Sequence, residues 1–129
     1  MRILIVDDSE TMRALIKRVI MISGVPAENV VEAKDGAAAL SILEHDVIDI
    51  LLTDIHMPVM TGVELLGKLA AEPRWAGLKR VVISTDGSAS RRHEVERFGV
   101  RCYLGKPFSP EVMRDVLEEI AGPAASTIG

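Results

Sequence analysis

One short stretch decides the fold class of this chain: RILIVDD, residues 2–8. A strand buried within a sheet is predicted over Arg2–Val6, because Ile3–Val6 is a continuous apolar run, and two carboxylates follow it at once. Apolar residues then recur at helical spacing over Glu10–Ser23, which predicts an amphipathic helix. A buried strand followed by such a helix is the repeating unit of a parallel sheet covered by helices.

The same unit recurs four more times along the chain. Further strands are predicted at Val30–Ala33, Val47–Thr53, Val81–Ser84 and Cys102–Leu104. Further helices are predicted over Gly36–Glu44, from a Thr61/Glu64 capping box through Leu69, over Ser88–Phe98, and from Pro110 to Ile120. This alternation predicts an α/β fold, a five-stranded parallel sheet with helices on both faces. One domain is expected over residues 1–121, and residues 122–129 are expected to form a short flexible tail.

Composition limits the classes of protein that the chain can form. With 129 residues, of which 48% are hydrophobic and 26% charged, one globular domain is expected. No uninterrupted apolar run exceeds four residues, so no membrane span is expected. The 15 basic against 19 acidic residues argue against direct nucleic-acid binding. Asp7 and Asp8 interrupt the first apolar stretch, which argues against a signal peptide, and the lone Cys102 fits a cytoplasmic protein.

Polar residues follow four of the five predicted strands directly. In order along the chain they are Asp7, Asp8, Asp54, Ser84, Thr85 and Lys106. Because ligands of open parallel sheets bind outside the carboxyl ends of the strands, we expect these side chains to share one edge. The second strand supplies only Glu32 and Lys34, which we expect to be peripheral.

Three carboxylates at one edge require positive charge. At about 4 Å and an effective dielectric constant of about 20, each pair of like charges costs about 4 kcal/mol. Lys106 can supply one positive charge, and a divalent cation can supply the rest. Mg²⁺ suits hard oxygen ligands that leave several coordination positions to water or phosphate. The sequence has no cluster of histidine and cysteine residues that would support a zinc site.

Three interpretations of these residues remain open on this argument alone. Asp54 could be a nucleophile that accepts a phosphoryl group, with Mg²⁺ and Lys106 neutralising its charge and Ser84 donating a hydrogen bond. The acids could instead form a metal site for hydrolysis. They could also be helix caps and solvated loop acids, which are common at helix starts.

The residues and their spacing resemble the receiver domain of two-component response regulators. The resemblance rests on the Asp7-Asp8 pair, Asp54, Met57-Pro58, Gly62, Ser84 and Lys106-Pro107. It covers residues 2 to 121 and is strongest toward the chemotaxis-type members that stand alone without an output domain.

The resemblance implies a flavodoxin-like (βα)5 fold with strand order 2-1-3-4-5. It implies that Asp54 accepts a phosphoryl group from a histidine kinase and that Lys106 pairs with that group. Magnesium would be bound by Asp8 and Asp54, by Asp7 directly or through water, and by the backbone carbonyl of His56. Such a protein is a signalling switch rather than an enzyme, with at most weak self-catalysed phosphorylation and dephosphorylation.

The resemblance also implies how a signal leaves the site. Ser84 would move toward the phosphoryl group, and Tyr103 would turn inward behind it. The move would reshape the face made by the fourth helix, the fifth strand and the fifth helix, where a downstream protein binds. Whether phosphorylation also drives formation of a homodimer is left open.

Two alternatives to the switch are a phosphohydrolase that forms an aspartyl phosphate and an interaction module that is never phosphorylated. The phosphohydrolase generally needs a second acid two residues after the nucleophile, where this chain has His56. Thr85 stands where receiver domains usually have alanine or glycine. We therefore hypothesise that Thr85 and His56 modulate the lifetime of the phosphorylated form, since a β-branched side chain narrows access to the phosphoryl group.

Overall fold

A computed structural model of the chain describes residues 1–106 and 108–128, with side chains described as far as residue 120. Within these residues, five parallel strands form one sheet in the order β2-β1-β3-β4-β5. The strands are β1 (Ile3–Val6), β2 (Val30–Ala33), β3 (Ile50–Thr53), β4 (Lys79–Ser84) and β5 (Val100–Gly105). The helices are α1 (Glu10–Ile22), α2 (Gly36–His45), α3 (Gly62–Ala70), α4 (Ala89–Glu96) and α5 (Pro110–Ile128), with 3-10 turns η1 (Ala27–Asn29) and η2 (Pro73–Trp75).

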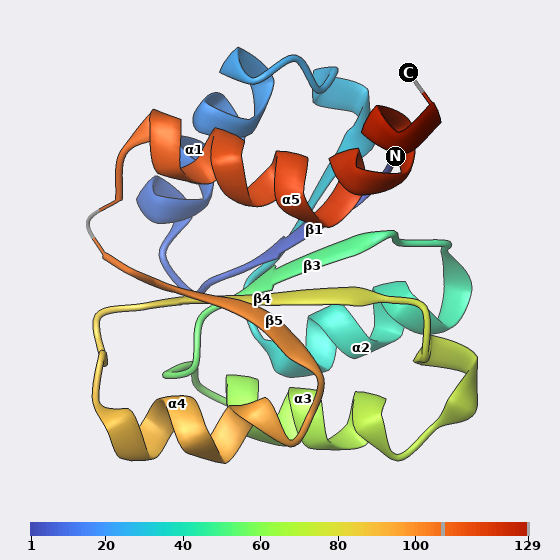
Figure 1. Cartoon of the computed structure of the whole chain (residues 1–129). Helices are drawn as coiled ribbons and strands as arrows, with labels where there is room; N and C mark the ends of the chain where they lie inside the picture. The colour runs from blue at the N-terminus through green and yellow to red at the C-terminus, as the bar shows by residue number, and fades with distance from the viewer. Residues whose placement is uncertain (107, 129) are drawn as a thin grey trace.

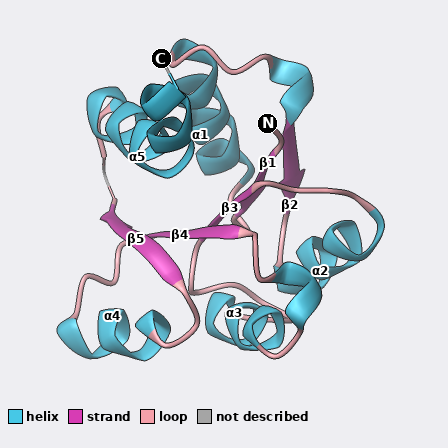
Figure 2. Cartoon of the chain, turned by 45° about the vertical axis from the view of Figure 1, so that its right-hand side comes forward, coloured by secondary structure: helices cyan, strands magenta, loops and turns pink. Residues whose placement is uncertain are grey.

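Helices cover both faces of the sheet, as predicted. The helices α1 and α5 lie on one face, and α2, α3 and α4 lie on the other (Figure 1; Figure 2). Alternate side chains of each strand point to opposite faces of the sheet, so the protein has two hydrophobic cores. Leu4 of β1 packs in the core under α2 and α3, whereas Ile3 and Ile5 pack in the core under α1 and α5. Each fully buried aliphatic side chain contributes about 1.5–3 kcal/mol. The predicted flavodoxin-like fold and its strand order are confirmed.

The predicted element ends are partly wrong. The strand predicted over Val47–Thr53 begins only at Ile50, where its backbone pairing with Ile3 of β1 starts. Val47, which precedes that pairing, is 77% exposed. Conversely, β4 begins at Lys79, before the predicted apolar run. The backbone ladder with β3 pairs Ile50 with Lys79 and so extends the strand through charged residues.

The helix starts follow the predicted capping chemistry. The Thr61 hydroxyl accepts the Glu64 N–H at 3.2 Å, and the Glu64 carboxylate accepts the Thr61 N–H at 3.0 Å. The Asp35 carboxylate likewise accepts the Ala38 N–H at 2.8 Å at the start of α2. Each such cap contributes about 1 kcal/mol by pairing backbone donors that have no partner within the helix. The capping box therefore fixes the start of α3.

The carboxyl-terminal part of the chain continues as helix. The backbone of α5 extends to Ile128, whereas residues 121–129 lie outside the part whose side chains the structure describes. The predicted flexible tail, 122–129, lies among these residues without described side chains, and its flexibility stays a prediction. Among the described residues, no helix is both long and apolar enough to cross a membrane.

Gly62, the first residue of α3, lies directly against the backbone of Asp54. A Cβ atom at this position would lie 2.0 Å from the Asp54 carbonyl oxygen, far inside any real contact. The Gly62 N–H also donates to the Ile55 carbonyl at 2.8 Å. The loop between β3 and α3 is therefore closed by backbone against backbone, and position 62 has no room for a side chain.

Replacing Gly62 by alanine is expected to destabilise the fold by about 2–3 kcal/mol, the upper range for forcing extra atoms into a packed interior. Gly77→Ala is the matched control, because a Cβ there meets no atom within 4 Å. Urea unfolding of both variants measures the difference. Equal stability of the two variants would contradict the close approach of α3 to Asp54.

Candidate functional site

Three carboxylates meet at the carboxyl edge of the sheet. Asp7 and Asp8 follow β1, and Asp54 follows β3, its direct neighbour in the sheet. One carboxylate oxygen from each acid lies within 4.8 Å of the others. The strand-end argument therefore predicted correctly which acids lie together. Oxygen ligands at this spacing fit a hard divalent cation such as Mg²⁺.

Asp7 is the most deeply buried of the three acids. Its side chain is only 2% exposed. One carboxylate oxygen accepts the Ser9 N–H at 2.9 Å, and the other accepts the Lys106 ammonium at 2.7 Å. The Asp7 N–H donates to the Ala33 carbonyl of β2 at 3.2 Å. Asp7 is thus fixed through its backbone, its side chain and a lysine.

Lys106 joins Asp7 to Asp54. Its ammonium lies 2.7 Å from one carboxylate and 2.9 Å from the other, and its side chain is only 10% exposed. Burial alone would lower the pKa of Lys106, but the hydrogen bonds to Asp7 and Asp54 outweigh burial and raise the pKa above its ordinary value. The ammonium therefore stays charged at neutral pH and offsets part of the negative charge of the acids.

Asp54 has one oxygen toward the lysine and one toward its own loop. The first accepts from Lys106, and the second accepts the Ile55 N–H at 2.7 Å. Its side chain is 12% exposed, so the carboxylate is partly accessible from solvent. A carboxylate that is held in place yet accessible can act as a nucleophile.

Ser84 and Tyr103, the predicted switch residues, both contact Asp86 in the loop between β4 and α4. The buried Ser84 hydroxyl accepts the Asp86 N–H at 3.1 Å. The Tyr103 hydroxyl donates to the Asp86 carbonyl. Burial is the main reason why the pKa of Tyr103 lies above its ordinary value. The two residues are therefore connected through a single loop residue.

Asp86 is a residue whose connections the sequence did not predict. Its carboxylate accepts the Ser88 N–H at 3.2 Å, and lies 3.3 Å from Nε of Arg91 and 3.2 Å from Nε2 of His56. Hydrogen bonds from Ser88, and then from His56 and Arg91, hold the pKa of Asp86 well below its ordinary value. Asp86 therefore links the loop after β3 to the first turns of α4.

The predicted modulators lie at the rim of the site. The His56 side chain is 56% exposed and contacts Asp86, while Thr85 is exposed in the loop after β4. The ligand role predicted for the His56 carbonyl stays a prediction. Pro107 of the predicted motif lies outside the described residues.

Glu32 was expected to be peripheral, and the structure places it one contact away from the acids. The Arg13 guanidinium pairs with Glu32 at 3.2 Å through Nε and donates to the Asp7 carbonyl at 2.7 Å through Nη1. No local pattern marks this pair, because Arg13 and Glu32 belong to different elements that only the fold brings together.

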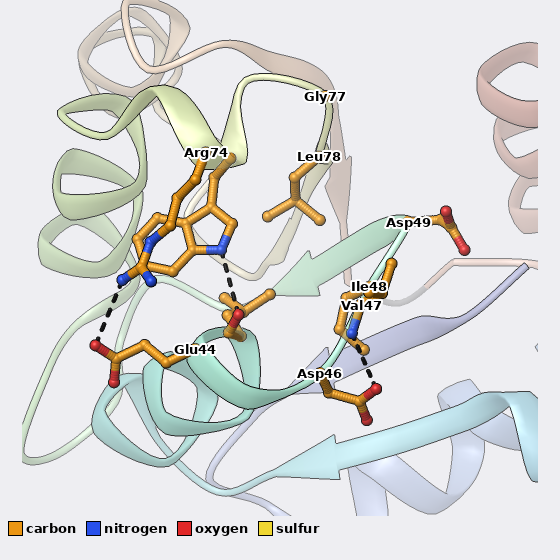
Figure 3. Close-up of a pocket in the computed structure, with 10 residues that line it drawn as sticks. Glu44, Asp46, Val47, Ile48, Asp49, Arg74, Gly77 and Leu78 are labelled. Atoms are coloured by element: carbon orange, nitrogen blue, oxygen red, sulfur yellow. Dashed lines mark hydrogen bonds and ion pairs between the residues drawn. The ribbon is translucent and has the colours of Figure 1, made fainter.

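A separate pocket of about 370 Å³ lies at the opposite edge of the sheet (Figure 3). It is lined by residues that precede β3 and β4, including Asp46, Val47 and Leu78. The indole N–H of Trp75 donates to the Leu43 carbonyl at 3.3 Å, between two residues of its lining. None of the predicted site residues lines this pocket, so the acidic site is not part of it.

The sheet order and the acidic edge define a flavodoxin-like α/β protein with a cluster of three acids at the carboxyl ends of its strands. The chain belongs to the response regulator receiver domain family, which it matches over residues 3–118. The resemblance predicted from the motif is thereby confirmed. This is a family of signalling proteins rather than of ordinary enzymes.

Individual proteins agree with this assignment. A chemotaxis protein CheY homolog of Campylobacter jejuni is 35% identical over 123 residues, which are 95% of this chain and 93% of that protein. The solved chemotaxis response regulator CheY4 of Vibrio cholerae is 28% identical with a TM-score of 0.82, covering 92% of this chain and 97% of that chain. The receiver domain of sensor histidine kinase PA1611 from Pseudomonas aeruginosa PAO1, solved with a magnesium ion coordinated in its active site cleft, is 22% identical with a TM-score of 0.82, covering 94% of this chain and 97% of that chain.

Asp86→Asn is expected to lower the stability of the protein at neutral pH. Because the folded-state pKa of Asp86 lies below the ordinary value of 3.8, its ionised form stabilises the fold above that pH. The contribution is lost as the pH falls further, toward the folded-state pKa. Urea unfolding at several pH values should therefore show a gap between wild type and variant that narrows below pH 3.8. A gap that does not depend on pH would mean that the charge of Asp86 is not responsible.

Proposed function

We propose that this protein is a phosphorylation-dependent signalling switch that accepts a phosphoryl group on Asp54. The observation that carries the proposal is the position of the Asp54 carboxylate, 2.9 Å from the Lys106 ammonium and grouped with Asp7 and Asp8. In the transfer, an Asp54 oxygen forms a bond to phosphorus while the bond from phosphorus to a kinase histidine nitrogen breaks. That nitrogen keeps the electron pair.

Magnesium is the cofactor that the donor set fits. Asp8 and Asp54 would bind it directly, Asp7 directly or through water, and the backbone carbonyl of His56 would complete the protein ligands. When bound, Mg²⁺ would neutralise charge on the phosphoryl oxygens. The magnesium ion in the cleft of the PA1611 receiver domain supports this choice of metal.

The chain's own residues prepare the transfer. Lys106 is held by two carboxylates, so its ammonium is already oriented toward the edge where the phosphoryl group would arrive. Fixed charges cost no reorganisation during the reaction, which is why such preorganisation accelerates it. The proposed donor is a histidine kinase, and the cytoplasm is the proposed compartment.

The proposed output is a change at the face of α4, β5 and α5. If Ser84 turns toward a phosphoryl group, its hydroxyl must leave the Asp86 N–H that it now accepts. Tyr103 donates to the carbonyl of the same residue, so both contacts would change together. The helix α4 buries only Val95 among its described residues, and few buried contacts make a segment easy to displace. A downstream protein would bind the altered face.

Two alternatives have less support. A phosphohydrolase would need an acid two residues after Asp54, and His56 at that place is exposed and paired with Asp86. An interaction module that is never phosphorylated would not require the buried ion pairs of Lys106 with Asp7 and Asp54.

Incubation with acetyl phosphate and Mg²⁺, followed by intact-mass measurement, tests the proposal. Wild type is expected to gain one phosphoryl group, and Asp54→Asn is expected to gain none because the nucleophile is missing. Removing Mg²⁺ with a chelator should also abolish the gain. An equal mass gain in Asp54→Asn would exclude Asp54 as the acceptor, and rapid turnover of a generic phosphate ester would favour the phosphohydrolase.

The lifetime of the phosphorylated form tests the roles of Thr85 and His56. Thr85→Ala is expected to speed dephosphorylation by about fivefold, equivalent to about 1 kcal/mol in the barrier, because a smaller side chain opens access for water. His56→Ala is expected to change the rate by a similar factor by removing the contact with Asp86. Phosphoprotein decay measured by intact mass provides the rates, with Ser41→Ala on the exposed side of α2 as a control. An unchanged dephosphorylation rate in either variant would end this hypothesis.

A further inference from the structure

Arg13 contacts the peptide that joins the first two acids of the site. Its Nη1 donates to the Asp7 carbonyl at 2.7 Å, and its Nε pairs with Glu32 at 3.2 Å. The Arg13 side chain is only 15% exposed. We propose that Arg13 is a positioning residue that orients the Asp7–Asp8 peptide and thereby raises the affinity of the site for Mg²⁺. This inference rests on the proposed function.

The planarity of the peptide bond explains why a hydrogen bond to the Asp7 carbonyl can orient Asp8. The carbonyl of Asp7 and the N–H of Asp8 share one rigid plane, so holding the carbonyl oxygen also sets the direction in which the Asp8 backbone starts. The Asp7 side chain and N–H are fixed by other contacts. Asp8 is exposed, so it lacks the packing that orients the buried Asp7. The contact from Arg13 is made to the peptide that the two acids share.

A simple surface ion pair between Arg13 and Glu32 would not need this geometry. Exposed pairs contribute about 0–1 kcal/mol and place no demand on a third group. Here the guanidinium uses one nitrogen for Glu32 and another for the Asp7 carbonyl. It thereby connects α1, β2 and the loop after β1, and Lys17 lies 4.0 Å from the other Glu32 oxygen.

Charge has to be balanced in any test of Arg13. Removing Arg13 alone leaves the Glu32 carboxylate without this partner near the acids, and extra negative charge favours cation binding. The double variant Arg13→Ala/Glu32→Ala removes one charge of each sign together with the hydrogen bond to Asp7. Lys17→Ala/Glu32→Ala also removes one charge of each sign but keeps the Arg13 donor, so it is the control matched in net charge.

Isothermal titration of the unphosphorylated proteins with Mg²⁺ measures the affinity directly. We expect Arg13→Ala/Glu32→Ala to bind about tenfold more weakly than wild type, the low end for loss of a group that supports a metal ligand. The control should stay within about twofold of wild type. In the acetyl phosphate reaction, the Mg²⁺ concentration for half-maximal rate should rise while the rate at saturating Mg²⁺ is retained.

Equal Mg²⁺ affinities of the two double variants would overturn the inference. A loss of rate that saturating Mg²⁺ does not restore would also overturn it. If circular dichroism shows that Arg13→Ala/Glu32→Ala does not fold, the Mg²⁺ affinity of Arg13→Met/Glu32→Gln is compared with that of Lys17→Met/Glu32→Gln instead. The methionine side chain keeps the aliphatic packing and has no N–H donor. Failure of the proposed function is distinguishable, because wild type would then bind Mg²⁺ without gaining a phosphoryl group.

Discussion

The ion pairs of Lys106 with Asp7 and Asp54 are the interaction on which the acidic edge depends. Parallel strand order places β1 beside β3, and this brings their carboxylates together whether or not a cation is bound. At such separations like charges repel by several kcal/mol. The ammonium offsets part of that repulsion at a buried position, 10% exposed, where opposite charges interact more strongly than they do in water. The site can therefore exist as a folded arrangement and still retain negative charge for a metal ion.

The sequence predicted the elements better than their ends. Continuous apolar runs identified the strands, but apolar character alone assigned Val47 to β3, although it is 77% exposed. The same criterion missed Lys79, which is in β4 because its backbone pairs with Ile50. Hydrogen bonding of the backbone, rather than the polarity of a side chain, decides where a strand begins.

The sequence predicted the charged residues of the candidate site but not the contacts that connect them to the surrounding elements. The strand-end rule identifies Asp7, Asp8 and Asp54 because parallel strands bring their carboxyl ends to one edge. It does not identify the contacts of Asp86 with His56 or of Arg13 with Glu32. Each of these pairs joins segments far apart in the chain, so no local spacing or capping signal predicts it.

The close approach of Gly62 to Asp54 has a consequence for how motion spreads from the site. The first residue of α3 lies against the carbonyl of Asp54 without an intervening side chain. A displacement of the Asp54 backbone toward α3 would therefore meet the backbone of Gly62 directly. Motion of the Asp54 backbone would therefore reach α3 without any side-chain rotation, whereas α4 is linked to the loop after β3 through the side chains of His56, Asp86 and Arg91.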